Sequence, residues 1–203
     1  MRVSHIRSFR QANCNGEDPV SKVLIGGIGN VLLGDDGVGP FVVRTLQSLY
    51  EFPADVEIAD LGTPGLDLVV HLASADTLIL VDCVNSSLPV GTVTAFKRED
   101  ILRNAPAPRM DPHSPALTES LLIAEMAGGG QKRTILIGIV GKHFEGAALS
   151  PEVRKAIPQA LNEIIRAAAS MRLSYRRRPK ALDPGIWWEQ VAPGYQLHPA
   201  AAD

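Results

Sequence analysis

The sequence predicts an α/β protein, a three-layer sandwich in which a twisted, mostly parallel sheet of about five strands has helices on both faces. Short apolar runs alternate along the chain with segments of helical periodicity, and this order is typical of a parallel sheet covered on both sides. The length of 203 residues suits one domain, and a hydrophobic content of 45% is ample for its core.

The first half of the sheet is predicted from three apolar runs. Val23–Ile28 is rich in β-branched residues and contains paired glycines near its end, which is typical of a buried strand. Gly37–Tyr50 follows with apolar residues at helical spacing, and Pro40 is tolerated in the first turn of a helix. The remaining elements of this half are a strand at Val56–Ala59, a helix at Leu66–Leu72 and a strand at Thr77–Val81.

The second half is predicted in the same way. Thr92–Phe96 and Thr134–Val140 are expected to be strands, and a proline-rich loop from Asn104 to Pro115 leads to a helix over Ala116–Ala127. Ser150 is expected to cap a last helix that reaches about Met171, because a proline and a glutamate follow it and both suit a helix start. We expect that helix to bend at its internal Pro158.

Charge and composition divide the chain into an N-terminal extension (1–21), one domain (22–171) and a C-terminal tail (172–203). The middle is acidic, both ends are mildly basic, and the formal net charge of −2 argues against a protein built to hold nucleic acid. In the tail, the run Arg176–Arg178 is expected to be a solvated linker, and the doublet Trp187–Trp188 is expected to pack on the core.

Cysteine use and hydropathy indicate a compartment. Cys14 and Cys83 lie in unlike contexts and make no disulfide framework, so we expect a reducing cytoplasm. No apolar stretch reaches the roughly 18 residues of a membrane-spanning helix, and the N-terminus lacks the apolar core of a secretory signal. We therefore expect no membrane association.

The loop after the first strand resembles a dinucleotide-binding turn only in part. The run Gly26-Gly27-Ile28-Gly29 follows a strand, but the third glycine of the fingerprint would fall at Leu32. Where a phosphate would dock, the chain has Asp35 and Asp36, which repel anions and attract cations. Asp35 is expected to cap the helix, and the second acid is more than capping requires.

Further acids follow the next two strands. Asp60 and Asp82 each end an apolar run, and ligand sites in parallel sheets gather at the carboxyl ends of strands. For one such acid, a helix cap or loop hydrogen bond is an equally good interpretation. His113 and His143 are the two histidines predicted to lie in loops near the ends of strands or helices. One imidazole with two carboxylates is a plausible site for a first-row metal, with positions left open for water or substrate.

Several motifs together resemble those of the nickel–iron hydrogenase maturation endopeptidases. The matching segments are Gly27–Gly39, Asp60–Gly65, Leu80–Cys83, Pro112–His113 and Leu149–Val153, and the resemblance covers about residues 22–170. It implies a twisted sheet between helices, which agrees with the fold predicted above. It also implies that the family's metal-contacting residues correspond to Asp36, Asp82 and His113.

The resemblance implies an endopeptidase that removes the C-terminal extension of a hydrogenase large-subunit precursor after nickel insertion. The precursor would be the partner, nickel would arrive with it, and we expect the protease to be a monomer. Two departures are visible: Asp36 stands where the family often has glutamate, and Asp111 precedes the histidine loop where the family often has serine. The second could set which precursor is accepted.

Two mechanisms remain open. Asp36, Asp82 and His113 could complete the coordination of the precursor's nickel, or Asp82 could act as general base on water in the manner of aspartic peptidases. Cys83, beside Asp82, is expected to be inert packing rather than a nucleophile. The alternative from another class is a non-catalytic nickel- or nucleotide-binding accessory module.

Overall fold

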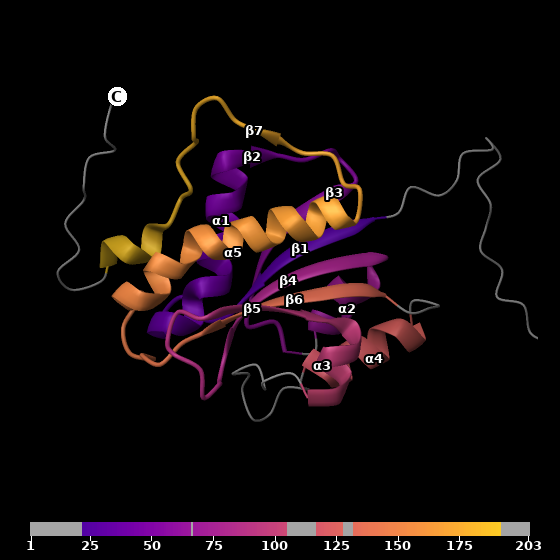
Figure 1. The fold of residues 1–203 in the computed structure, drawn as a ribbon, viewed down its shortest axis with the longest axis horizontal. Coiled ribbons are helices and arrows are strands. Elements are labelled where there is room, and N and C mark those ends of the chain that lie inside the picture. The colour runs from indigo at the N-terminus through magenta and orange to yellow at the C-terminus, as the bar shows by residue number, and fades with distance from the viewer. Residues whose placement is uncertain (1–21, 66, 105–116, 128–131, 192–203) are drawn as a thin grey trace, which may run out of the picture.

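The computed structural model describes residues 22–65, 67–104, 117–127 and 132–191 (Figure 1). The N-terminal extension and His113, both singled out in the sequence, lie outside these ranges. The elements are β1 (Val23–Ile28), η1 (Gly34–Gly37), α1 (Val38–Leu49), β2 (Tyr50–Glu51), β3 (Val56–Gly62), α2 (Asp67–Ala73), β4 (Thr77–Val84), β5 (Val93–Lys97), α3 (Arg98–Asn104), α4 (Leu117–Ala127), β6 (Arg133–Val140), α5 (Pro151–Ser170), β7 (Arg176–Arg177) and η2 (Trp187–Val191).

The main sheet has five strands in the order β3-β1-β4-β6-β5, which confirms the predicted mostly parallel sheet. β3, β1, β4 and β6 run parallel, and β5 pairs antiparallel with β6 at the edge. Parallel neighbours need a crossover of a dozen or more residues, commonly a helix. The connection from β4 to β5 has no helix, so the chain turns back at the carboxyl edge and β5 runs in the opposite direction.

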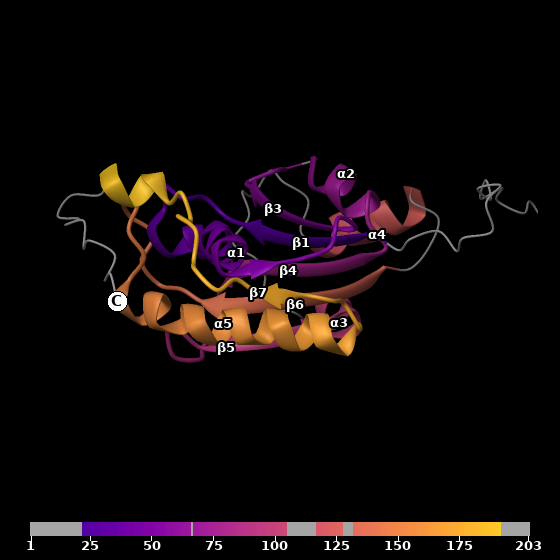
Figure 2. The same cartoon turned by 90° about the horizontal axis from the view of Figure 1, so that it is seen from above.

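Alternate residues of the central strands supply two separate cores. Ile25 of β1 and Ile79 of β4 belong to a cluster with the buried faces of α1 and α5. Their chain neighbours Leu24 and Leu78 belong to a second cluster with α2 and α4. Because side chains alternate along a strand, each central strand feeds both layers. Figure 1 shows α1 and α5 on one side of the sheet and α2 and α4 on the other, so helices cover both faces as the sequence predicts. Figure 2 looks onto the sheet and shows its strands side by side from β3 to β5.

The ends of two strands differ from the prediction. β4 continues through Asp82 to Val84, because the register with β6 persists to the pair Val84 and Val140. β3 likewise continues through Asp60 to Gly62. Both acids therefore lie inside strands rather than after them. α3 was not predicted at all, because Ile101 is the one buried residue among Arg98–Arg103 and no helical periodicity is visible.

The segment after α5 packs back on the domain. The backbone N–H groups of Arg178 and Leu182 donate to the carbonyls of Leu49 (2.8 Å) and Ser48 (3.0 Å) at the end of α1. Arg176 and Arg178 both pair with Glu51, and Arg176–Arg177 form a strand beside β2. Arg176 and Arg177 are exposed to solvent, as expected, but the run is not a linker. Trp188 is buried in the core, whereas its neighbour Trp187 is largely exposed.

Among the residues placed by the structure, no helix has the length and apolar character needed to cross a bilayer.

Candidate functional site

The candidate site lies at the carboxyl ends of β1 and β4, which are adjacent strands at the centre of the sheet. From β1 the chain crosses to β3 on one side, and it then passes to β4 and later β6 on the other side. This reversal of strand order is the place where open α/β sheets usually bind ligands. The short helix η1 follows β1 and contacts β4, so residues from both strands meet here.

Two acids meet at this point. Asp36, in η1, has 5% of its surface exposed, and Asp82, in β4, has 2%. Burial, and secondly the nearby charge of Asp36, raises the pKa of the Asp82 carboxyl well above its usual value, although the Cys83 N–H partly offsets this. Asp82 Oδ2 finds no hydrogen-bond partner within the described part of the chain. A buried carboxylate oxygen without a partner is costly, and it marks a position where a cation or proton would be stabilised.

The loop between β1 and η1 fixes Asp36. The carboxylate Oδ2 accepts a hydrogen bond from the backbone N–H of Asn30 (2.7 Å), and the Asp36 N–H donates to the Leu33 carbonyl (3.1 Å). Gly29 has a φ of +136°, and a Cβ at this position would clash with the Asp36 carbonyl oxygen. Only glycine tolerates both constraints, so this glycine serves the close approach to Asp36 rather than to a phosphate.

Asp35, the adjacent acid, has a different role from the predicted helix cap. No side chain caps α1, whose N-cap residue is Gly37. The fully buried Asp35 carboxylate instead accepts from the backbone N–H groups of Lys142 (3.0 Å), His143 (2.9 Å) and Ser150 (2.7 Å). Burial alone raises the pKa of Asp35, but these donors outweigh it and hold the pKa below its usual value. Asp35 thus ties the first loop to the loop before α5.

The other predicted acids and histidines do not join Asp36 and Asp82 in the described residues. Asp60 accepts a hydrogen bond from the Gly62 N–H (3.1 Å) and lies 3.6 Å from a guanidinium nitrogen of Arg44. Its role is therefore the local hydrogen bond that the sequence allowed as an alternative to a ligand site. His143 has an exposed side chain and contributes its backbone to Asp35. His113 falls in the segment 105–116, outside the described ranges, so its place in the site stays a prediction.

The thiol beside the acid pair is unsuited to nucleophilic catalysis. Cys83 is 1% exposed, and burial together with the charges of Asp82, Asp36 and Asp35 raises the pKa of its thiol. A thiol must ionise to attack a carbonyl, so this environment suppresses the reactive form. The side chain packs against Gly141, where a Cβ would clash with the Cys83 sulfur.

Metal-binding capacity can be judged for the described residues alone. Within these ranges, no three His, Cys, Asp or Glu residues are grouped so that they could hold a metal ion. Asp36 and Asp82 supply two oxygen donors, which suit a hard or borderline divalent cation that brings further ligands. Of the predicted set, the structure describes Asp36 and Asp82, whereas His113 lies outside the described ranges.

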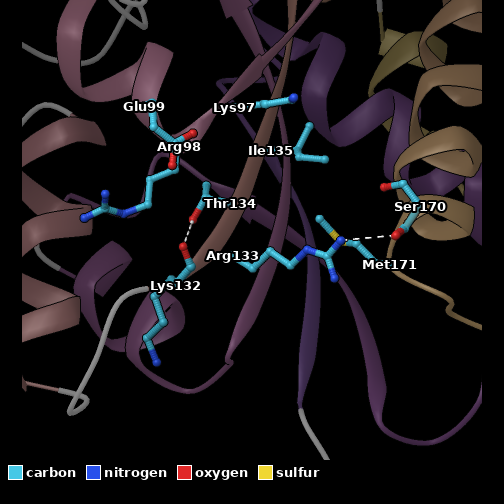
Figure 3. Close-up of a pocket in the computed structure, with 9 residues that line it drawn as sticks. All are labelled: Lys97, Arg98, Glu99, Lys132, Arg133, Thr134, Ile135, Ser170 and Met171. Carbon is cyan, nitrogen blue, oxygen red and sulfur yellow. Dashed lines mark hydrogen bonds between the residues drawn. The ribbon is translucent and has the colours of Figure 1, made fainter.

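A cavity lies elsewhere in the molecule (Figure 3). It has a volume of about 570 Å³ and is lined by Lys97, Arg98, Glu99, Lys132, Arg133, Thr134, Ile135, Ser170 and Met171. Arg133 begins β6, five residues before the partner of Asp82, so it lies roughly 16 Å along the strand from the acids. In Figure 3 the guanidinium groups of Arg98 and Arg133 point away from each other, and Arg133 donates to the Ser170 carbonyl (3.1 Å). This cavity has no converging pair of acids.

Comparison with known proteins places the chain in a family. The family model described as "HycI: Hydrogenase maturation protease" matches residues 40–167. The hydrogenase expression/formation protein HupD of Rhizobium leguminosarum bv. viciae is 32% identical over 167 residues, which are 81% of this chain and 83% of that protein. The hydrogenase 2 maturation protease of Escherichia coli (strain K12) is 31% identical over 151 residues, covering 72% of this chain and 90% of that one.

A solved structure of a hydrogenase maturating endopeptidase has the same fold. The hydrogenase maturating endopeptidase HybD from E. coli superposes with a TM-score of 0.69 and 28% sequence identity, covering 77% of this chain and 98% of that chain. Its fold, a five-stranded mixed sheet between helices, is the fold described above. The chain therefore belongs to the hydrogenase maturation protease family.

Proposed function

We propose that the protein is an endopeptidase that removes the C-terminal extension of a nickel–iron hydrogenase large-subunit precursor after nickel insertion. Family membership and the likeness to a maturating endopeptidase support this function. The structural observation that carries it is the buried pair of Asp36 and Asp82 at the switch point of the sheet. Such a pair is costly unless a cation or a shared proton neutralises it, and both are means of activating water for hydrolysis.

In the proposed site, Asp36, Asp82 and His113 contact nickel that is carried by the precursor. The unpartnered Oδ2 of Asp82 is the atom with a free acceptor position, and the Asp36 charge beside it favours a cation. Carboxylate and imidazole donors suit a first-row divalent ion. Because nickel belongs to the substrate, cleavage becomes conditional on metal loading.

Water can be activated at this pair in two ways. The precursor's nickel could polarise the water or the scissile carbonyl, with both carboxylates as ligands. Alternatively, the two carboxyls could share a proton, as in aspartic peptidases. Asp82 is then the proton donor rather than the general base expected from the sequence, and ionised Asp36 accepts the proton from water. Burial and the nearby Asp36 charge raise the pKa of Asp82, which favours its protonated form and is the direction that the second arrangement needs.

Incubation of the protein with nickel-loaded and metal-free precursor tests the function. We expect the loaded precursor to lose a mass equal to its C-terminal extension, measured by intact-mass spectrometry, and the metal-free precursor to remain intact. Equal cleavage of both would reject nickel recognition, and cleavage of neither would reject the peptidase function. Tight binding of nickel alone without cleavage would instead support the alternative of an accessory nickel carrier.

The Asp82→Asn variant separates the two mechanisms. If Asp82 contacts nickel, the variant loses both cleavage and the preference in binding for loaded over metal-free precursor. If Asp82 serves only in proton transfer, cleavage falls while that binding preference persists. Pull-down of the two precursor forms beside the mass assay reads both effects.

A further inference from the structure

Two consecutive leucines are exposed beside the acid pair. Leu32 has 54% of its surface exposed and Leu33 has 44%, although the preceding Val31 packs against the core. Both lie in the short connection from β1 to η1, and η1 carries Asp36. Single exposed leucines are common on protein surfaces, but an adjacent pair at the rim of a buried polar site is not explained by packing.

The backbone of this loop is fixed, so the leucines cannot turn inward. The Leu32 N–H donates to the side-chain oxygen of Asn30 (2.9 Å), and the Leu33 N–H donates to the Asn30 carbonyl (3.0 Å). The N–H of Asn30 in turn donates to Asp36 Oδ2 (2.7 Å). Asn30 therefore couples the position of the two leucines to the position of the acid.

A second contact holds the loop from the other side. The N–H of Gly34 donates to the carbonyl of Gly146, in the loop that Asp35 ties down. Gly34 has a φ of +52°, and a Cβ there would clash with the carbonyl of His143. The leucines thus stand on a short, rigid segment between two anchored points.

From this geometry we propose that Leu32 and Leu33 form a docking ridge for an apolar segment of the precursor next to the peptide bond to be cleaved. The proposal rests on the proposed function. Asp36 and Asp82 are almost completely buried, and Asn30 joins Asp36 to the loop of Leu32 and Leu33, so a peptide bond that reaches the acids comes close to these leucines. An exposed apolar pair on a rigid rim offers binding energy at little entropic cost, because the loop is already ordered.

Two other exposed apolar residues lack this continuity with the acids. Val70 of α2 and Met126 of α4 are 68% and 86% exposed, but they lie on helices that cover one face of the sheet. No hydrogen bond described in the structure links either residue to Asp36 or Asp82. They provide a matched control for loss of exposed apolar surface.

The ridge is tested with a Leu32→Ser/Leu33→Ser variant and a nickel-loaded hydrogenase large-subunit precursor. The Kd for the precursor is measured by biolayer interferometry, and single-turnover cleavage is followed in parallel. We expect the Kd to rise about tenfold or more, and the cleavage rate at saturating protein to stay within about threefold of wild type. The melting temperature should be unchanged, because both side chains are exposed.

Two further variants complete the test. Leu32→Met/Leu33→Met should restore binding, because methionine offers similar apolar area, and Val70→Ser/Met126→Ser should leave binding unchanged. An unaltered Kd in the serine variant, equal loss in the control variant, or failure of the wild type to bind the precursor would each overturn the ridge. Wild-type binding without cleavage, with the Kd still raised by the serine changes, would reject the proposed peptidase function and leave the ridge standing.

Discussion

At the amino end of the sheet, Arg98 donates to Glu125 through two guanidinium nitrogens, one of them at 2.6 Å, whereas at the carboxyl end Asp36 and Asp82 lie together as two acids. In the first pair the mutual hydrogen bonds stabilise the charged form of each partner. They are the main reason why the pKa of Glu125 is lowered and the pKa of Arg98 is raised. In the second pair, burial and like charge raise the pKa of Asp82. Opposite charges are therefore paired at the amino end of the sheet, whereas two acids are buried side by side at the carboxyl end.

The adjacent Asp35 sharpens this contrast within the carboxyl end itself. It is as buried as Asp82, yet its pKa is lowered, because three backbone N–H groups point at its carboxylate. Residue type and burial therefore do not separate a structural acid from a reactive one. The count of donors around the carboxylate does.

The largest expected effect comes from Asp82→Asn. We expect the cleavage rate of loaded precursor to fall about 10³-fold or more, because either mechanism needs this carboxyl. Glu99→Gln at the amino end, an exposed acid that lines the cavity of Figure 3, is the control and should cleave normally. Normal cleavage by the Asp82→Asn variant would show that the Asp82 carboxyl takes no part in the reaction.

The same variant should be more stable than the wild type at neutral pH. A carboxyl with a raised folded pKa keeps its proton in the native state while the unfolded chain has lost it. The wild type therefore loses stability as pH rises from about 4, the unfolded pKa of Asp, up to the folded pKa. Urea unfolding across this pH range should show a gap between the two proteins that widens with pH. A constant gap would contradict an unsatisfied Asp82.

Asp35→Asn should act in the opposite direction on stability. An amide can accept through one oxygen only, and its NH₂ group faces backbone donors, so we expect a loss of about 2–4 kcal/mol in the free energy of unfolding. The stability that Asp35 contributes is present above pH 4 and is lost as pH falls through its lowered folded pKa. Asp36→Asn is the matched neighbour and should lose cleavage with little change in stability. Urea unfolding of both variants beside the cleavage assay compares the two acids.

At the amino end, Arg98→Met should affect stability alone. Glu125 would keep the Lys132 N–H (2.9 Å) but lose its guanidinium partner, and we expect a loss of about 1–3 kcal/mol. Replacement of both partners, Arg98→Met/Glu125→Met, should recover most of this loss, because no charge is then left unpaired. Both variants should cleave precursor at the wild-type rate. A large drop in cleavage would link the two ends of the sheet.

Cys83→Ala is expected to have the smallest effect. The thiol is buried and its pKa is raised, so cleavage should stay within about twofold of wild type and stability should fall by about 1 kcal/mol. The folded wild type should also resist alkylation by iodoacetamide, followed by mass spectrometry. Rapid alkylation with loss of cleavage would restore the thiol as a candidate nucleophile.

The sheet could be predicted because its central strands are buried on both faces. All eight residues of β4 and all six of β1 are buried, and continuous apolar composition is the signal of such strands. The antiparallel direction of β5 and the helix α3 were not visible in the same way. Strand direction depends on how the chain connects, and α3 buries too few residues to give a periodic pattern.

The acids of the site could be located approximately, since both follow or end apolar runs. The role of Asp35 could not, because its three donors lie 107, 108 and 115 positions further along the chain. The packing of the C-terminal segment was signalled in part by Trp187 and Trp188. Sequence alone could not assign the buried position to Trp188, because the two residues are identical and adjacent.

The contacts of Asp35 have a consequence for the order of folding. Loops of more than 100 residues close late in folding. Their closure costs more conformational entropy than the formation of local contacts, and the new contacts are stable only when both ends of the loop are structured. Until residues 142–150 have left the ribosome, the Asp35 carboxylate lacks its three backbone donors. The neighbouring Asp36 is then held by its local hydrogen bonds to Asn30 and Leu33, without the tie to the loop before α5. A growing chain therefore carries no assembled acid pair, and proteolytic competence arrives only with the last third of the domain.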